Sequence, residues 1–178
     1  MKNSKKKWIN FSIIAIVSFI IDVITKMIVL KNMSLGETIP VIGKVFSWHF
    51  TYNKGALFGI NPTAFIPWLP THIFFYIFSA IALIILVNFV KQISAEKDSL
   101  SFWGAALVTG GALGNLLDRI VRPADGVIDF VMVDLGFRIG PIPFDPWPIF
   151  NGADIFINIG VALLLISSFL PSAGATNE

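Results

Sequence analysis

The sequence contains no cysteine and only two histidines, His49 and His72. Without cysteine, the chain can have no disulfide framework, no thiolate metal site and no cysteine nucleophile. The two histidines do not form the His-Glu-x-x-His spacing of a zinc protease. The sequence therefore gives little support to a metal site, and we expect neither a metal nor another cofactor.

Charged residues are also scarce. The 178 residues include 11 Asp and Glu and 13 Lys and Arg, which leaves a net charge of +2. This small excess lies mainly at the N-terminus, so it does not indicate a nucleic-acid partner. Hydrophobic residues make up 55% of the chain and the mean hydropathy is +0.78. Such a composition is typical of integral membrane proteins.

Four apolar runs could each cross a bilayer, which takes about 20 residues. They lie at about residues 8–30, 65–90, 100–121 and 150–170. Residues 35–60 mix short apolar stretches with Gly, Pro, Thr and Asn, a pattern typical of β-rich structure. Residues 122–148 hold five prolines and are predicted to form a loop. We predict an all-α membrane protein of one domain, residues 1–178, with four transmembrane helices and a small β-rich extramembrane segment between the first and second.

The positive-inside rule orients these spans. Four lysines precede the first span, which places the N-terminus in the cytoplasm. Four spans return the C-terminus to the same side, so residues 35–65 and 122–148 face outward together. Arginines on the outer side weaken the rule without reversing it: Arg119, Arg122 and Arg138.

A cleaved signal peptide is the other interpretation of this N-terminus. The apolar run is long, no small-residue cleavage site follows it, and Asp22 and Lys26 lie inside it. These features favour a retained transmembrane helix.

Two aspartates are the main candidates for chemistry. Asp129 lies in the second outer segment and Asp154 begins the fourth span, so the topology lets the two side chains meet. An acid near hydrocarbon is costly and usually functional. Two neighbouring carboxylates share one proton, so one can activate water while the other polarises a carbonyl, as in aspartic proteases.

Other polar residues follow helical spacing. Asn115, Asp118 and Arg119 would share one face of the third span, unless this is a glycine packing face on which Asp118 and Arg119 pair with each other. Asn151 could simply cap the fourth helix. Capping explains Asp154 less well, because it lies a turn further in.

Two further groups have plain structural interpretations. Asp22 and Lys26 stand one helical turn apart, and we favour a local ion pair there, with support of the site as the other possibility. Asn53 with Gly55 would pass as a turn in any soluble protein.

Taken together, five motifs resemble the lipoprotein signal peptidase (signal peptidase II) family from Asp22 to about Gly160. They are Asp22-x-x-Thr-Lys26, Thr51-Tyr-Asn-x-Gly-Ala-x-Phe-Gly59, Gly110-Gly-Ala-x-Gly-Asn-x-x-Asp-Arg119, Val127-Ile-Asp-Phe130 and Phe150-Asn-x-Ala-Asp154. Two departures from the family pattern are Val23, where Gln is usual, and Gly152, where a larger apolar residue is common.

The resemblance implies a catalytic pair at Asp129 and Asp154. Residues that bind the substrate or support the pair would be Asn53, Asn115, Asp118, Arg119 and Asn151. We further expect structural support from Asp22, Lys26, Gly111 and Gly114.

The resemblance also implies a substrate and a location. The substrate would be a diacylglyceryl-modified prolipoprotein, cut just before its lipidated cysteine. We expect a monomer, in contact with membrane lipid, in the bacterial inner membrane, with its active site toward the outer face. The alternative is a small transporter or proton-relay subunit, but that class should show deeper acids and internal repeats, which we do not find.

Overall fold

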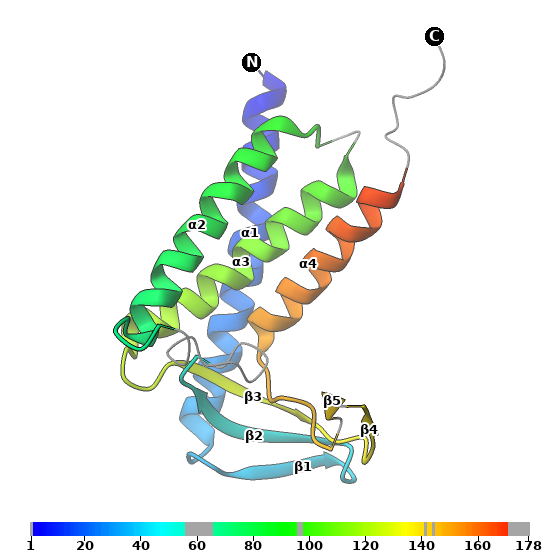
Figure 1. Cartoon of the computed structure of the whole chain (residues 1–178). Helices are drawn as coiled ribbons and strands as arrows, with labels where there is room; N and C mark the ends of the chain where they lie inside the picture. The colour runs from blue at the N-terminus through cyan, green and yellow to red at the C-terminus, as the bar shows by residue number, and fades with distance from the viewer. Residues whose placement is uncertain (1, 56–65, 96–97, 141, 144, 171–178) are drawn as a thin grey trace.

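The computed structural model describes residues 2–55, 66–95, 98–140, 142–143 and 145–170. These residues include four helices long and apolar enough to cross a membrane: α1 (Lys2–Asn32), α2 (Thr71–Gln92), α3 (Ser99–Val121) and α4 (Gly152–Phe169). Figure 1 shows the helices as a bundle with a small sheet beyond one end. The predicted fold class is confirmed.

Helix α2 begins six residues later than predicted. The helix begins at Thr71, whereas the sequence predicted a span from residue 65, which lies outside the described residues. Pro70 precedes the helix with an extended backbone, φ −56° and ψ 136°. Prolines at 67 and 70 disfavour helical backbone in the residues before them, so the helix starts only after the second one.

The sheet is antiparallel, in the order β1-β2-β3. Strands β1 (Thr38–Ile42) and β2 (Phe46–Asn53) come from the segment predicted to be β-rich. The third strand, β3 (Val127–Val133), comes from residues that we predicted to be a loop, and so do the two-residue strands β4 (Arg138–Ile139) and β5 (Ile142–Pro143). The first five residues of β3 are all buried, so they lack the alternating pattern by which a half-buried strand is recognised.

Strand register brings distant residues together. Thr51 of β2 lies opposite Asp129 of β3, and Asn53 lies opposite Val127. On its other side, β3 pairs with the residues just before α4: Val131 and Phe150 exchange backbone hydrogen bonds of 2.8 and 3.1 Å. This pairing fixes Asp129 beside the first turn of α4.

Helix α3 packs between the other helices and is the most buried of the four. Helix α1 turns toward the bundle a stripe of buried residues three or four positions apart. Glycines of α3 allow very close approach: a Cβ at Gly110 would lie 2.5 Å from the Ala15 carbonyl oxygen, and one at Gly111 would lie 2.5 Å from that of Ala153. The backbones of α1 and α4 therefore nearly touch α3 where the polar residues begin.

Candidate active site

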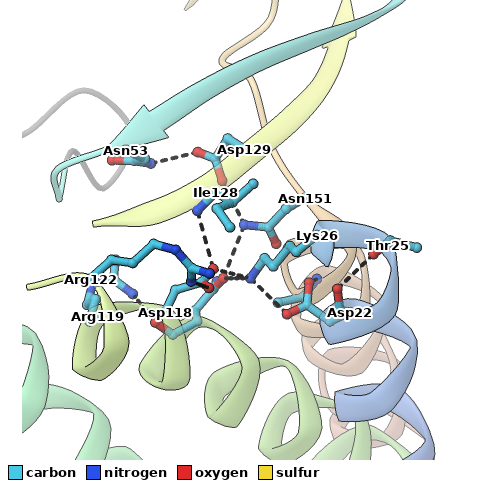
Figure 2. A network of polar contacts seen from close by, with 12 residues as sticks. Asp22, Thr25, Lys26, Asn53, Asp118, Arg119, Arg122, Ile128, Asp129 and Asn151 are labelled. Carbon is cyan, nitrogen blue, oxygen red and sulfur yellow. Dashed lines mark hydrogen bonds and ion pairs between the residues drawn. The ribbon is translucent and has the colours of Figure 1, made fainter. Parts of the chain in front are cut away.

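Strands β2 and β3 hold the carboxylate of Asp129, which is 2% exposed. The Asn53 side-chain amide donates a hydrogen bond to Asp129 Oδ2 at 3.0 Å, as Figure 2 shows. Asn53 Oδ1 in turn accepts from the Gly55 backbone N–H at 3.0 Å. The plain turn suggested by the sequence is therefore present, but its asparagine also contacts the acid.

Two glycines allow the turn at Asn53 to pack closely against its neighbours. Gly126, with φ +94°, lies so close to Asn53 that a Cβ would collide with its carbonyl oxygen. Gly55, with φ +118°, lies against α2, and its Cβ would approach the Phe75 ring to 2.5 Å. Both positions need the positive φ and the small volume of glycine.

Asn151 and Asp154 form a capping box at the start of α4. Asn151 Oδ1 accepts from the Asp154 backbone N–H at 3.0 Å, and Asp154 Oδ2 accepts from the Asn151 backbone N–H at 3.1 Å. Capping thus accounts for one oxygen of Asp154, contrary to our expectation from the sequence. The other oxygen, Oδ1, accepts from the Asn115 amide at 2.9 Å, which capping does not explain.

The Asn151 side chain joins both candidate acids. Its amide nitrogen donates to Asp129 Oδ1 at 2.6 Å and to Asn115 Oδ1 at 3.1 Å. Its carbonyl oxygen is used in the cap of Asp154, and the residue is fully buried. One asparagine therefore sets the position of Asp129 relative to Asp154.

The electrostatic environment favours a proton on Asp129. Burial raises the pKa of Asp129 to about 7, and the negative charge of Asp154 adds to the rise. Hydrogen bonds from Asn53 and Asn151 oppose it, as does the more distant charge of Lys26. Near neutral pH this carboxyl can therefore both hold and release a proton.

Lys26 lies at the centre of a buried ion network. Its ammonium is 2.8 Å from Asp22 Oδ2, 2.9 Å from Asp118 Oδ2 and 2.9 Å from Asn115 Oδ1. Asp22 is fully buried and Asp118 is 4% exposed. The local Asp22–Lys26 pair favoured by the sequence is present, as one part of this larger network.

The two acids of the network also bind backbone groups of other elements. Asp22 Oδ1 accepts from the Ala153 N–H of α4 at 2.7 Å. Asp118 Oδ2 accepts from the Ile128 N–H of β3 at 3.2 Å (Figure 2). Asp118 also pairs with Arg122 at 2.8 Å, rather than with Arg119 as the alternative interpretation supposed. Gly114 lies directly against Asp22, where a Cβ would collide with the carboxylate.

Two aromatic residues of α2 contact Arg119. Its guanidinium lies 4.2 Å from the centre of the Phe75 ring, and its backbone carbonyl accepts from the Tyr76 hydroxyl at 2.7 Å. The charge of Arg119 interacts with those of Asp129 and Asp154. Sequence reasoning missed Phe75 and Tyr76, because an aromatic residue in a transmembrane run gives no signal that distinguishes it from ordinary core.

A pocket of about 210 Å³ opens beside this arginine. Its lining includes Lys54, His72, Arg119 and Gly126, so it adjoins the Asn53 turn. Within the described residues, no three His, Asp or Glu side chains gather as a metal site would require.

Comparison with known proteins identifies the family. The sequence profile described as Signal peptidase (SPase) II matches residues 14–170. The chain belongs to the signal peptidase II family. A lipoprotein signal peptidase of Treponema denticola is 36% identical over 170 residues, which are 93% of this chain and 94% of the relative.

Two solved structures of bacterial membrane enzymes share the fold. The first, determined in meso at 2.3 Å, has a TM-score of 0.75 and 29% identity, over 95% of this chain and 93% of its own. The second, determined in meso at 1.9 Å, has a TM-score of 0.73 and 31% identity, over 90% and 92%. Family membership implies a multi-pass membrane protease that cleaves signal peptides from prolipoproteins, which favours the enzyme over the transporter alternative.

The ion network predicts a stability effect. Lys26→Met leaves the buried Asp22 carboxylate without a cation, so we expect a loss of about 3–5 kcal/mol in the free energy of unfolding. Asp22→Asn combined with Lys26→Met should recover much of this loss, because the uncompensated charge is gone. Thermal or denaturant unfolding in detergent measures the change in stability of the single and the double variant. Lys31→Met, on the exposed end of the same helix, is the control, and an equal effect of the two lysine variants would contradict the network.

The raised pKa of Asp129 predicts a pH dependence of stability. Between about pH 4 and 7 the folded state keeps a proton that the unfolded state, with a pKa near 3.8, has lost. Stability should therefore fall as pH rises through this window and level off above about 7. Asp129→Asn should reduce the difference in melting temperature between pH 5 and pH 8, whereas Asp125→Asn, at an exposed position, should not. Equal pH dependence in all three proteins would contradict the assignment.

Proposed function

We propose that this protein is an aspartic endopeptidase that cleaves diacylglyceryl-modified prolipoproteins just before the lipidated cysteine. Asp129 and Asp154 are the catalytic pair. The observation that carries the proposal is the position of Asn151, which donates to Asp129 and caps the backbone of Asp154 at the same time. With a pKa of about 7 for Asp129, the pair can carry one proton at neutral pH.

The two acids have different surroundings, which suggests different roles. Asp129 is the more buried and carries the proton, so it donates a hydrogen bond to the oxygen of the scissile carbonyl. Asp154 is half-buried and accepts N–H donors on both oxygens, so it takes the proton of the attacking water. After attack, a proton passes to the leaving amine and the peptide bond breaks.

The surrounding polar residues position the pair or the substrate. In this proposal Asn53, Asn115 and Asn151 fix the carboxylates, and Arg119 contributes a positive charge beside them. Asp118 aligns β3 through its hydrogen bond to Ile128. The remaining supporting residues pack or pair beneath the site: Asp22, Lys26, Gly111 and Gly114.

The site lies at the sheet end of the bundle, opposite the first turn of α1 and the last turn of α4 (Figure 1). We propose that both termini are cytoplasmic and that the site faces the outer side of a bacterial inner membrane, as the N-terminal lysines favour. The enzyme works as a monomer and as one domain. The signal helix and acyl chains of the substrate enter sideways from the lipid, since the helix faces next to the site are apolar and exposed.

Loss of either acid should abolish activity. We expect Asp129→Asn and Asp154→Asn each to leave less than a few per cent of cleavage, because each removes the shared proton system. A gel-shift assay with a lipidated prolipoprotein in detergent measures this. Asn115→Ala should retain more, with a loss of about 10- to 1000-fold, as expected of a positioning group. Asp125→Asn is the matched control, since this acid is exposed and outside the network.

Two outcomes would contradict this mechanism. Substantial activity in either Asp→Asn variant would remove the pair from the chemistry. Loss of activity in a chelator, restored by a divalent cation, would instead place the two aspartates in a metal site.

The orientation has a test that needs no enzymology. Single cysteines replacing Lys54 or Asp125 should react with an impermeant thiol reagent from the outer side, because both flank the site. A cysteine replacing Lys5 should react only after the membrane is broken. The native chain has no cysteine to confuse the labelling. Opposite labelling of positions 54 and 125 would show that the span count is wrong.

A further inference from the structure

A groove lies at the end of the bundle away from the sheet. Its volume is about 380 Å³, and it lies between the beginnings of α1 and α3 and the α2–α3 turn. The polar part of its lining is Lys6, Lys7 and Asn10 of α1. None of the described residues that line the groove is acidic, so it carries a local positive charge.

One of the two lysines is fixed in place. The Lys7 ammonium donates to the carbonyl oxygen of Ile93 at the end of α2, at 2.5 Å. An ammonium has three N–H donors, so this bond leaves others for a ligand. Lys6 is exposed. Asp98, whose Oδ2 accepts from the Ser94 backbone N–H at 2.8 Å, does not line the groove. The groove therefore presents cationic donors to an acceptor from outside.

The other walls are apolar and lie deeper along the helix. Ile13 is 54% exposed and Trp103 is 51% exposed, while Phe102 beneath them is 3% exposed and packs edge-on against Phe11. From Lys6 to Ile13 the helix rises about 10 Å. The groove thus passes from cationic at the end of the bundle to apolar toward its middle. Tryptophan at this boundary is typical of the membrane interface.

We propose that this groove binds an anionic glycerophospholipid of the leaflet around the N-terminal end. Lys6, Lys7 and Asn10 hold its phosphodiester, and an acyl chain lies along Ile13 and Trp103. The apolar wall favours a lipid over a free phosphate ion. The two ammonium groups favour a headgroup with net negative charge over a zwitterionic one. The groove is at the far end of the helices from the acids, so the proposal is independent of the catalytic one.

Neighbouring lysines offer a matched comparison. Lys5 and Lys6 are both exposed, but only Lys6 lines the groove. Lys5→Gln and Lys6→Gln remove the same charge from the same helical turn. If the N-terminus attracted anionic lipid only through its overall charge, both substitutions would weaken lipid binding equally. If the lipid binds in the groove, only Lys6→Gln should weaken it.

The experiment measures binding of phosphatidylglycerol to the detergent-solubilised full chain by native mass spectrometry. We expect Lys6→Gln to weaken binding by about fivefold or more, as for one lysine near an anionic headgroup. Lys5→Gln should change it by less than about twofold. Phosphatidylcholine should bind more weakly than phosphatidylglycerol to the native chain. Millimolar inorganic phosphate should not displace the lipid.

A second measurement tests the apolar wall. Phosphatidylglycerol with brominated acyl chains should quench the tryptophan fluorescence of the native chain more than that of Trp103→Phe, because the chain lies against Trp103. The proposal is overturned if Lys5→Gln and Lys6→Gln weaken binding equally, if the two lipids bind equally well, or if free phosphate competes. Quenching that is unchanged in Trp103→Phe would also overturn it.

Discussion

The buried ammonium of Lys26 organises the polar end of the bundle. It lies within 2.9 Å of oxygens on Asp22, Asp118 and Asn115, so one cation links α1 to α3. Each acid also accepts a hydrogen bond from a backbone N–H: Asp22 from that of Ala153 in α4, and Asp118 from that of Ile128 in β3. Because Asp129 follows Ile128 and Asp154 follows Ala153, the two candidate catalytic residues are each one residue from an anchored backbone group. The geometry of the site thus depends on an ion network that does not itself contact Asp129.

Four acids in one region are distinguished by their partners. Asp22 and Asp118 contact cations, whereas within the described part of the chain Asp129 accepts side-chain hydrogen bonds from the amides of Asn53 and Asn151. A neutral amide stabilises a carboxylate less than an ammonium does, so it does not fully offset the cost of burial. This environment leaves Asp129 with a pKa of about 7. Asparagine fixes the position of the acid while leaving its proton exchangeable.

Much of this arrangement follows from the sequence, for physical reasons. The lengths of the apolar runs predict the four helices, and helical spacing correctly places Asp22 one turn from Lys26. Topology places residues 129 and 154 on the same side. Residues of two different helices have no fixed separation in the sequence. The Asp118–Lys26 contact and the Arg119–Phe75 stacking could therefore not be predicted from the sequence. Strand β3 was missed because burial on both faces removes the alternation that marks a strand.

Helix α1 relates the site to the membrane. From Lys6 to Lys26 a helix rises about 30 Å, which is the thickness of the hydrocarbon core. If Lys6 lies at one interface, as charged residues at a helix end do, then Lys26 and its network lie at the other. At that depth the acids border both water, which hydrolysis consumes, and hydrocarbon, in which a lipidated substrate resides. A site deeper in the bundle would lack water, and a site beyond the sheet would require the acyl chains to leave the membrane. In the proposed mechanism, the length of α1 therefore constrains the depth at which the two candidate catalytic carboxylates can lie.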